Sequence, residues 1–190
     1  MRLVQFLTPG GERRVAVVRD AATLQLLHNT AYVRDVALAA QRAGQPLPAV
    51  VEARLSSETV SYEEVIADNR LLPPLDHPDP AHCILSGTGL DHLGSAQARN
   101  SMHTKLNSGE LTDSMKMFKL GLEGGKPAPG QIGVQPEWFY KGDGSWLVAP
   151  GHGLPLPPYA LDGGEEPELV GLYVIGDDGA VLRVGFALGN

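Results

Sequence analysis

The hydrophobic pattern at the start of the chain predicts a compact α+β unit. Residues 2–7 and 13–19 are two short apolar stretches on either side of Pro9-Gly10-Gly11, which indicates a β-hairpin. From Thr30 to Ala43 the apolar residues recur at helical spacing, with Thr30 as the predicted N-cap and Gly44 at the end of the helix. The predicted buried face of this helix consists of Val33, Val36, Ala37 and Ala40.

A second short helix and a linker follow. Ser61 and Glu64 form a capping-box pair that predicts a helix from Ser61 to Asp68. Residues 73–80 are then rich in proline, which indicates a stiff linker. We therefore expect a small N-terminal α+β domain over residues 1–72, the linker over 73–80, and a second domain over 81–190.

The pattern of the second half predicts mostly β-structure with long loops. A buried strand at Cys83–Leu85 leads into a Gly-rich turn at 87–89 and a polar helix from Asp91 to about Lys105. A Gly- and Pro-rich segment from Gly121 onward is typical of a long loop. Later strands are expected at 138–140, 146–148, 169–175 and 180–188, the last two joined by a turn at 176–179. The predicted fold class is α+β, mostly β.

The sequence stops at Asn190, directly after a predicted strand. A sheet edge left open there would be exposed to unwanted strand pairing. We therefore expect that a longer natural protein continues the fold, and that residues 81–190 are the N-terminal part of their domain.

Charge and cysteine content narrow the function classes. The formal net charge is -7, which disfavours nucleic acid as a main partner because phosphate binding needs clustered Lys and Arg. Cys83 is the single cysteine, so no internal disulfide forms, as in a reducing compartment. The sequence shows no secretory h-region and no apolar run of about 18 residues. We expect a cytoplasmic protein without a membrane partner.

Two carboxylates precede the predicted strand at 169–175. Glu166 and Glu168 are two residues apart, so on a strand they project to one side. Paired carboxylates suit a hard cation such as Mg²⁺ or Mn²⁺. The alternative is a solvated acidic turn before an edge strand, which Pro167 favours.

Three further side chains could carry chemistry. His92 follows the strand and Gly-rich turn, where it could act as a general base or orient a water, or simply cap a surface helix. Arg99 could bind a substrate carboxylate, or belong to a solvated helix face. Lys141 ends an aromatic strand and could approach an anionic ligand. Its aromatic neighbours Trp138 and Tyr140 are predicted to be core or interface residues, with the core favoured, and Cys83 is predicted to be a core residue.

The order of these motifs resembles the fumarylacetoacetate hydrolase superfamily. There the catalytic domain opens with a strand and an Asn-Tyr-x-x-His-x-x-Glu-like segment, followed by a Phe-x-Lys-Pro-like strand and a Glu-x-Glu metal pair. The matching pieces are residues 83–92, 138–141 and 166–168. In finer detail, residues 86–103, 112–125, 136–144 and 162–190 are similar to a bacterial branch described as 2-keto-3-deoxy-arabonate dehydratases.

The resemblance implies a mixed β-roll and a metal-dependent lyase. Glu166 and Glu168 would bind Mg²⁺ or Mn²⁺, His92 would transfer the proton or position water, and Arg99 and Lys141 would bind the substrate. It implies dehydration of a 2-keto-3-deoxy sugar acid through a metal-stabilised enolate, by a homodimer.

Two alternatives remain open. One is a hydrolase that cleaves a C–C bond of acylpyruvate or 2,4-diketo acids through the same intermediate. The other is an inactive fragment or a ligand-binding member of the fold. Ser95 stands where the family often has Glu, and the family's third metal carboxylate would fall beyond Asn190. Both departures favour the second alternative.

Overall fold

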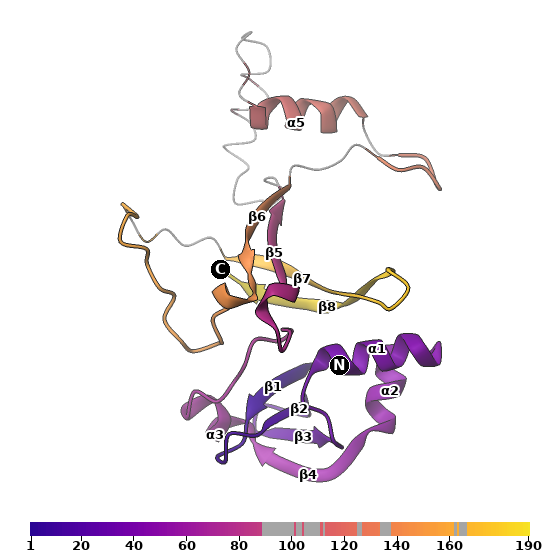
Figure 1. Cartoon of the computed structure of the whole chain (residues 1–190), viewed down its shortest axis with the longest axis vertical. Coiled ribbons are helices and arrows are strands. Elements are labelled where there is room, and N and C mark those ends of the chain that lie inside the picture. Colours follow the sequence, from indigo (N-terminus) through magenta and orange to yellow (C-terminus); the bar gives the residue numbers. More distant parts are fainter. Residues whose placement is uncertain are drawn as a thin grey trace. The chain divides into compact units, whose positions relative to one another are not determined.

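The computed structural model describes residues 1–88, 101, 104, 111, 113–124, 127–133, 138–161, 163 and 167–190. The chain forms two compact units, one made of Met1–Cys83 with Gly144–Asn190 and the other of Ile84–Asp143 (Figure 1). The structure is mixed α+β with more strand than helix, as predicted. The β-roll and the domain boundary at 73–80 stay predictions.

An antiparallel four-stranded sheet forms the centre of the first unit. Its strands β1 (Leu3–Leu7), β2 (Arg13–Val18), β3 (Thr23–Leu27) and β4 (Leu55–Ser61) lie in sequence order. Leu3 pairs with Val17 and Leu7 with Arg13, so the predicted hairpin is confirmed. Because successive strand residues point to opposite faces, the apolar run of β2 supplies core residues to both sides of the sheet.

Helices cover the two faces of this sheet. On one face, Val15 and Val17 pack with residues of α1 (Val33–Ala43) and α2 (Leu47–Ala53). On the other face, Ala16 and Val18 pack with Val65 of α3 (Tyr62–Ala67) (Figure 1). All four residues of the predicted apolar face of α1 are buried. None of the helices that the structure describes has the length and apolar character needed to cross a bilayer.

The helix ends test three predictions about caps. Gly44 ends α1 in the left-handed conformation, with φ 60°, and Ser61 Oγ accepts a hydrogen bond from the Glu64 N–H at 3.2 Å. The predicted end of α1 at Gly44 and the Ser61 cap of the second helix are confirmed. The predicted N-cap is wrong, because α1 begins at Val33 and the Thr30 hydroxyl donates instead to the His28 carbonyl at 2.7 Å.

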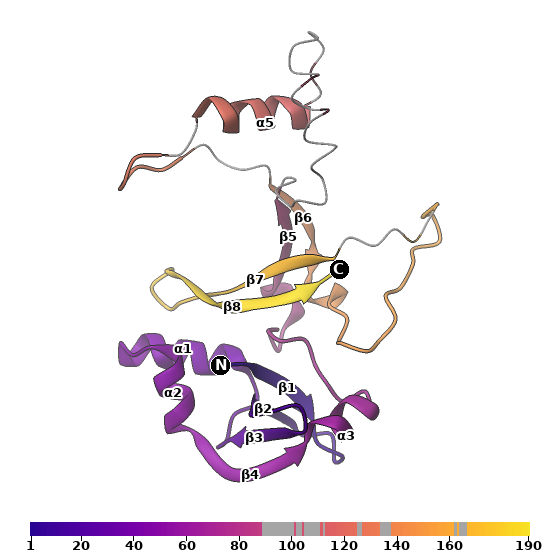
Figure 2. The same ribbon diagram turned by 180° about the vertical axis from the view of Figure 1, so that it is seen from behind.

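The last two strands form the predicted hairpin. β7 (Glu168–Ile175) pairs antiparallel with β8 (Val181–Gly189), and the Gly176 N–H donates to the Ala180 carbonyl across the turn at 2.8 Å. Figure 2 shows this hairpin from behind. Val184 is the extra residue of a bulge in β8, because Leu172 lies opposite Gly185 and Tyr173 opposite Arg183.

Register and bulge together divide the hairpin into two faces, since directly opposed residues share a side. The inner face packs on α1, where Val174 is buried beside Ala37 and Leu38. Its register positions are Glu168, Val170, Leu172, Val174, Leu182, Gly185, Ala187 and Gly189, and the bulge residue Val184 packs on the same side. The outer face holds the large side chains Leu169, Tyr173, Ile175, Val181, Phe186 and Leu188.

The second unit contains a two-stranded ribbon and a helix among its described residues. β5 (Ile84–Thr88) pairs antiparallel with β6 (Trp138–Asp143), and α5 spans Asp113–Gly124. The predicted start of a long loop at Gly121 is therefore wrong, because the last residues of α5 include glycines that a helix tolerates at its end. The predicted helix at 91–105 lies largely outside the described residues.

Two further strand predictions need correction. The strand expected at 146–148 is absent from the described residues, where a 3₁₀ helix occupies Gly144–Trp146 instead; an aromatic-aliphatic triplet is too short to specify a strand. The strand expected at Cys83–Leu85 begins at Ile84, after the 3₁₀ helix Pro80–His82. It is not of the buried type, because Ile84 is 70% exposed.

Candidate functional site

Lys141 lies at an irregularity in the β5–β6 ribbon. Leu85 is opposite Gly142, and Ser86 is opposite Tyr140. Lys141 is thus the extra residue of a bulge, a feature that redirects a side chain and occurs often beside binding sites. The following residue, Gly142, has φ 132°, a conformation that favours glycine. The local sequence Lys-Gly therefore allows the bulge.

The surroundings of Lys141 combine an amine with an aromatic ring. Its Nζ lies 5.6 Å from the centroid of the Phe139 ring. Gly87 of β5 is opposite Phe139 of β6. A Cβ added to Gly87 would lie 2.6 Å from Phe139 Cε2 and 3.0 Å from Lys141 Cε. The ring and the lysine stem therefore cover Gly87, and a larger residue would displace them. The ammonium of a lysine is a compact point charge that can bind an anionic group.

The aromatic neighbours of Lys141 are not core residues. Trp138 is 55% exposed and Tyr140 is 59% exposed, so the prediction that they are buried is wrong. Consecutive aromatic residues on a strand point to both faces of the strand. In the described two-stranded ribbon, these side chains stay exposed to solvent on both faces. Cys83 is likewise half-buried rather than a core residue.

Glu168 is the first residue of β7. It lies opposite Gly189 and is half-buried. Its register position belongs to the inner face of the hairpin, together with Val170 and Leu172. The carboxylate is thus attached to a paired strand, which fixes its backbone more firmly than a loop would.

The five predicted site residues divide into three groups. Lys141 belongs to the second unit and Glu168 to the first. His92, Arg99 and Glu166 lie outside the described residues. Among the residues that the structure does describe, no group of three or more His, Cys, Asp or Glu side chains is placed to bind a metal ion. Two carboxylates are still a donor set that Mg²⁺ and Mn²⁺ prefer, so the pair Glu166 and Glu168 stays a prediction.

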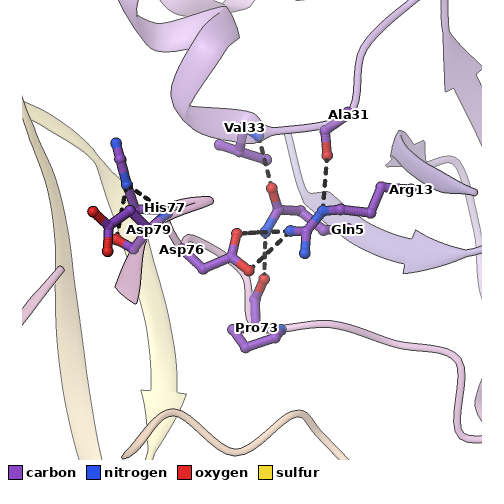
Figure 3. A network of polar contacts seen from close by, with 8 residues as sticks. All are labelled: Gln5, Arg13, Ala31, Val33, Pro73, Asp76, His77 and Asp79. Atoms are coloured by element: carbon purple, nitrogen blue, oxygen red, sulfur yellow. Dashed lines mark hydrogen bonds and ion pairs between the residues drawn. The ribbon is translucent and has the colours of Figure 1, made fainter. Parts of the chain in front are cut away.

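A buried polar network in the first unit was missed by the sequence reasoning (Figure 3). The Gln5 side chain is fully buried. Its Nε2 donates to the Pro73 carbonyl at 2.7 Å and to Asp76 Oδ1 at 2.9 Å, and its Oε1 accepts from the Val33 N–H at 2.8 Å. The signal in the sequence was a single polar residue within the apolar strand Leu3–Leu7.

Arg13 completes this network. Its Nη2 donates to both carboxylate oxygens of Asp76, at 2.7 and 2.9 Å, and its guanidinium carbon lies 4.2 Å from the centroid of the Tyr32 ring. The donors of Gln5 and Arg13 and the acceptors of Asp76 thus form hydrogen bonds with one another and with the backbone. The network therefore holds residues 73–76 against the sheet, and we assign it a structural role.

His77, Asp79 and His82 form a second polar group nearby. The Asp79 N–H donates to His77 Nδ1 at 3.0 Å, and His82 Nδ1 lies 2.9 Å from Asp79 Oδ2 (Figure 3 shows His77 and Asp79). Asp79 Oδ1 also accepts from the Ala81 N–H at 3.0 Å, and this hydrogen bond above all lowers the pKa of Asp79. Asp79 is therefore the N-cap of the 3₁₀ helix Pro80–His82, and both of its carboxylate oxygens have partners within this group.

The comparisons with known proteins add no relative. No protein-family model, no curated protein and no solved structure matches this chain. The resemblance to the fumarylacetoacetate hydrolase superfamily therefore rests on the motifs and their order.

Proposed function

We propose that this chain belongs to a divalent-metal-dependent lyase that dehydrates a 2-keto-3-deoxy sugar acid. The main support is the order of the motifs along the sequence: Asp91-His92 after β5 and a Gly-rich turn, Lys141 on β6, and a Glu-x-Glu motif whose second glutamate, Glu168, begins β7. The bulge at Lys141 adds support, because it presents a cation beside Phe139 on an exposed strand.

In this proposal each side chain has a defined task. Lys141 and Arg99 bind the anionic and hydroxyl groups of the substrate, the first as a point charge and the second in bidentate fashion. His92 accepts the proton from C3, and the C4–O bond then breaks, so that the C4 hydroxyl leaves and, with one proton, departs as water. Glu166 and Glu168 hold Mg²⁺ or Mn²⁺, which when bound supplies Lewis-acid stabilisation of negative charge on the 2-oxo group. The single cysteine and the net charge of -7 support a cytoplasmic protein without a nucleic-acid partner.

Metal binding can be tested on the chain itself. Mg²⁺ or Mn²⁺ should raise the midpoint of thermal unfolding, because an ion at a hundred times its dissociation constant stabilises the folded state by about 2.7 kcal/mol. The variant Glu168→Gln should lose this shift. Glu58→Gln, at an exposed position of β4, removes the same charge elsewhere and should keep it. An unchanged shift in Glu168→Gln would remove the metal assignment.

The reaction can be tested by following the loss of 2-keto-3-deoxy-arabonate and of acylpyruvate in parallel. For the intact enzyme we expect metal-dependent loss of the first compound. Lys141→Gln should raise KM at least about tenfold by removing a charge-assisted contact, whereas Lys116→Gln on α5 should not. Cleavage of acylpyruvate alone would indicate the C–C hydrolase. Metal binding without turnover of either compound would indicate a ligand-binding protein.

A further inference from the structure

A short segment of the first unit carries two imidazoles that lie close together, with one aspartate between them. The ring centroids of His77 and His82 lie 5.0 Å apart, with 35° between the ring planes. The sequence of this segment is His-Pro-Asp-Pro-Ala-His. Each proline fixes its own φ and restricts the residue before it to extended backbone, and Asp79 has φ -105° and ψ 109°. The backbone between the two rings is therefore preorganised.

Asp79 holds both rings through the same ring nitrogen. His82 Nδ1 lies 2.9 Å from Asp79 Oδ2, and His77 Nδ1 lies 2.9 Å from the Asp79 carbonyl oxygen. When each Nδ1 carries the hydrogen, it donates to these oxygens and leaves the lone pair on Nε2. The Asp79 N–H, 3.0 Å from His77 Nδ1, is the partner in the other tautomer of that ring. Hydrogen bonds from imidazole to a carboxylate or a backbone carbonyl are the ones that orient histidines for metal binding.

The two Nε2 atoms point away from Asp79. Figure 3 shows His77 Nδ1 turned toward Asp79 and the other ring nitrogen turned away from it. The His82 side chain is 68% exposed. In the part of the chain that the structure describes, neither Nε2 has a hydrogen-bond partner. Both atoms can therefore accept an external ligand.

The spacing of the two rings matches that of a pair bound to one metal ion. Zn²⁺ binds an imidazole nitrogen at about 2.0–2.1 Å, and the ring centre lies about 1.2 Å farther along the bond, so the ion lies about 3.2 Å from each ring centre. Two imidazoles separated by about 90–110° around one ion then have centroids about 4.5–5.2 Å apart. The observed 5.0 Å lies within this range, so one ion can bind both rings without movement of the backbone.

The ligand type selects the class of metal. Imidazole suits Zn²⁺, Ni²⁺ and Cu²⁺, whereas Mg²⁺ and Mn²⁺ prefer carboxylate and water oxygens. Asp79 supplies negative charge beside the rings but is not a ligand in this arrangement, because both of its carboxylate oxygens have partners. A site of this kind therefore discriminates against the ions that a pair of glutamates would bind.

We propose that His77 and His82 bind one divalent ion of the Zn²⁺, Ni²⁺ and Cu²⁺ class through their Nε2 atoms. Asp79 is the positioning residue, and water fills the remaining coordination positions. The ion links residues 77 and 82 across the two prolines and so fixes the backbone that enters the 3₁₀ helix Pro80–His82. This site shares no residue with the proposed enzyme site and is independent of the enzyme activity.

The first test is a titration of the 190-residue chain with Zn²⁺ in competition with a chromophoric chelator. We expect saturable binding. His77→Ala and His82→Ala should each raise the dissociation constant at least about tenfold, because a single imidazole cannot chelate. The matched control is His28→Ala, which removes an exposed imidazole elsewhere in the same unit and should leave the constant unchanged. A chain that does not bind Zn²⁺, or two alanine variants that bind it like the parent chain, overturns the proposal.

The second test addresses the role of Asp79. In Asp79→Asn the remaining oxygen can still accept from the Ala81 N–H, but the new NH₂ group cannot accept from His82 Nδ1. The dissociation constant for Zn²⁺ should therefore rise about ten- to a hundredfold. Asp178→Asn is the control, since Asp178 also accepts from the N–H two residues later. In NMR spectra of the imidazole nitrogens, Zn²⁺ should shift Nε2 of His77 and His82 and leave both Nδ1 atoms protonated. Zn²⁺ bound at Nδ1, or an Asp79→Asn variant of parental affinity, contradicts this arrangement.

The third test separates this site from the carboxylate pair and from the adjacent thiol. A hundredfold excess of Mg²⁺ over Zn²⁺ should not displace the Zn²⁺, and Glu168→Gln should leave its dissociation constant unchanged. Cys83→Ser, next to His82, should also leave the constant unchanged. Loss of Zn²⁺ binding in either variant, or displacement by Mg²⁺, would assign the ion to other ligands and overturn the proposal. Failure of the enzyme assay alone would leave these results as they are.

Discussion

At the residue scale, Gln5 is a buried amide in an otherwise apolar strand, and both its nitrogen and its oxygen form hydrogen bonds. The carboxamide donates to one chain segment and accepts from another. Burial of such a group is tolerated because its hydrogen bonds are satisfied. The same hydrogen bonds make the protein sensitive to substitution at this position, since removal of the amide leaves several buried polar groups without their hydrogen bonds.

We therefore expect Gln5→Leu to destabilise the protein by about 1–3 kcal/mol. The substitution keeps the volume nearly constant and leaves the Val33 N–H and the Pro73 carbonyl without their partner. Chemical denaturation monitored by circular dichroism measures the change. Gln45→Leu, at an exposed position, should change the free energy of unfolding by less than about 0.5 kcal/mol. Equal stability of the Gln5→Leu variant and the parent chain would show that the network adds nothing to folding.

The sequence predicted the backbone role and the burial of single residues less completely than it predicted helices and strands. Lys141 was predicted on an aromatic strand, and it lies there. Its role as the extra residue of a bulge depends on the register with β5, which no local pattern in β6 specifies. The burial of Trp138 and Tyr140 was predicted from residue type alone, and exposure depends on what covers the strand.

At the scale of elements, the C-terminal hairpin is attached to α1 through its turn. Arg42 Nε donates to Asp177 Oδ2 at 2.6 Å, and Gln41 Nε2 donates to Asp178 Oδ1 at 2.6 Å. The hydrogen bond from Arg42 lowers the pKa of Asp177. The pKa of Asp178 is lowered chiefly by a hydrogen bond from the Ala180 N–H. The turn therefore depends on ionised carboxylates.

This attachment should be sensitive to acid. A carboxyl whose pKa is lower in the folded than in the unfolded state stabilises the fold above about pH 4, and the contribution is lost as the pH falls through the folded value. NMR titration of the Asp177 carboxyl carbon should show a midpoint below the ordinary range for Asp. Arg42→Gln should move that midpoint upward, and Arg2→Gln at the exposed N-terminus should not. An unshifted midpoint in the parent chain would contradict the ion pair.

Elements with strong local signals were predicted well, and those without them were missed. Both hairpins and α1 have regular apolar spacing bounded by turn or cap residues, and all three are confirmed. β4 has the sequence LSSETVS, which lacks an apolar run, and it forms because β3 offers a paired edge. α2 has seven residues and a proline in its first turn, too few for periodicity to appear.

At the scale of the whole molecule, burial is concentrated in the N-terminal sheet. Val15 and Ala16 of β2 are fully buried, and β2 is paired on both edges, by β1 and by β3. In the β5–β6 ribbon, Ile84, Trp138 and Tyr140 are exposed. Few buried contacts and accessible backbone hydrogen bonds lower the free energy of local opening.

Amide hydrogen exchange should therefore differ between these two sheets. We expect the amides of Val15 and Ala16 to exchange at least about a hundredfold more slowly than those of Phe139 and Tyr140. NMR or mass spectrometry of exchanging amides provides the measurement, with rates corrected for the intrinsic exchange of each sequence. Equal protection in the two sheets would mean that the ribbon opens only when the whole chain unfolds.

The contact between Gln5 and Val33 also settles where a helix starts. The first N–H groups of a helix lack partners within it, and α1 has no side-chain cap of its own at Tyr32. A strand residue 28 positions earlier supplies the acceptor instead. The first N–H of α1 is therefore bonded to the sheet. During synthesis this strand leaves the ribosome ahead of the helix, so the side-chain amide that caps the start of α1 is already present when the first turn emerges.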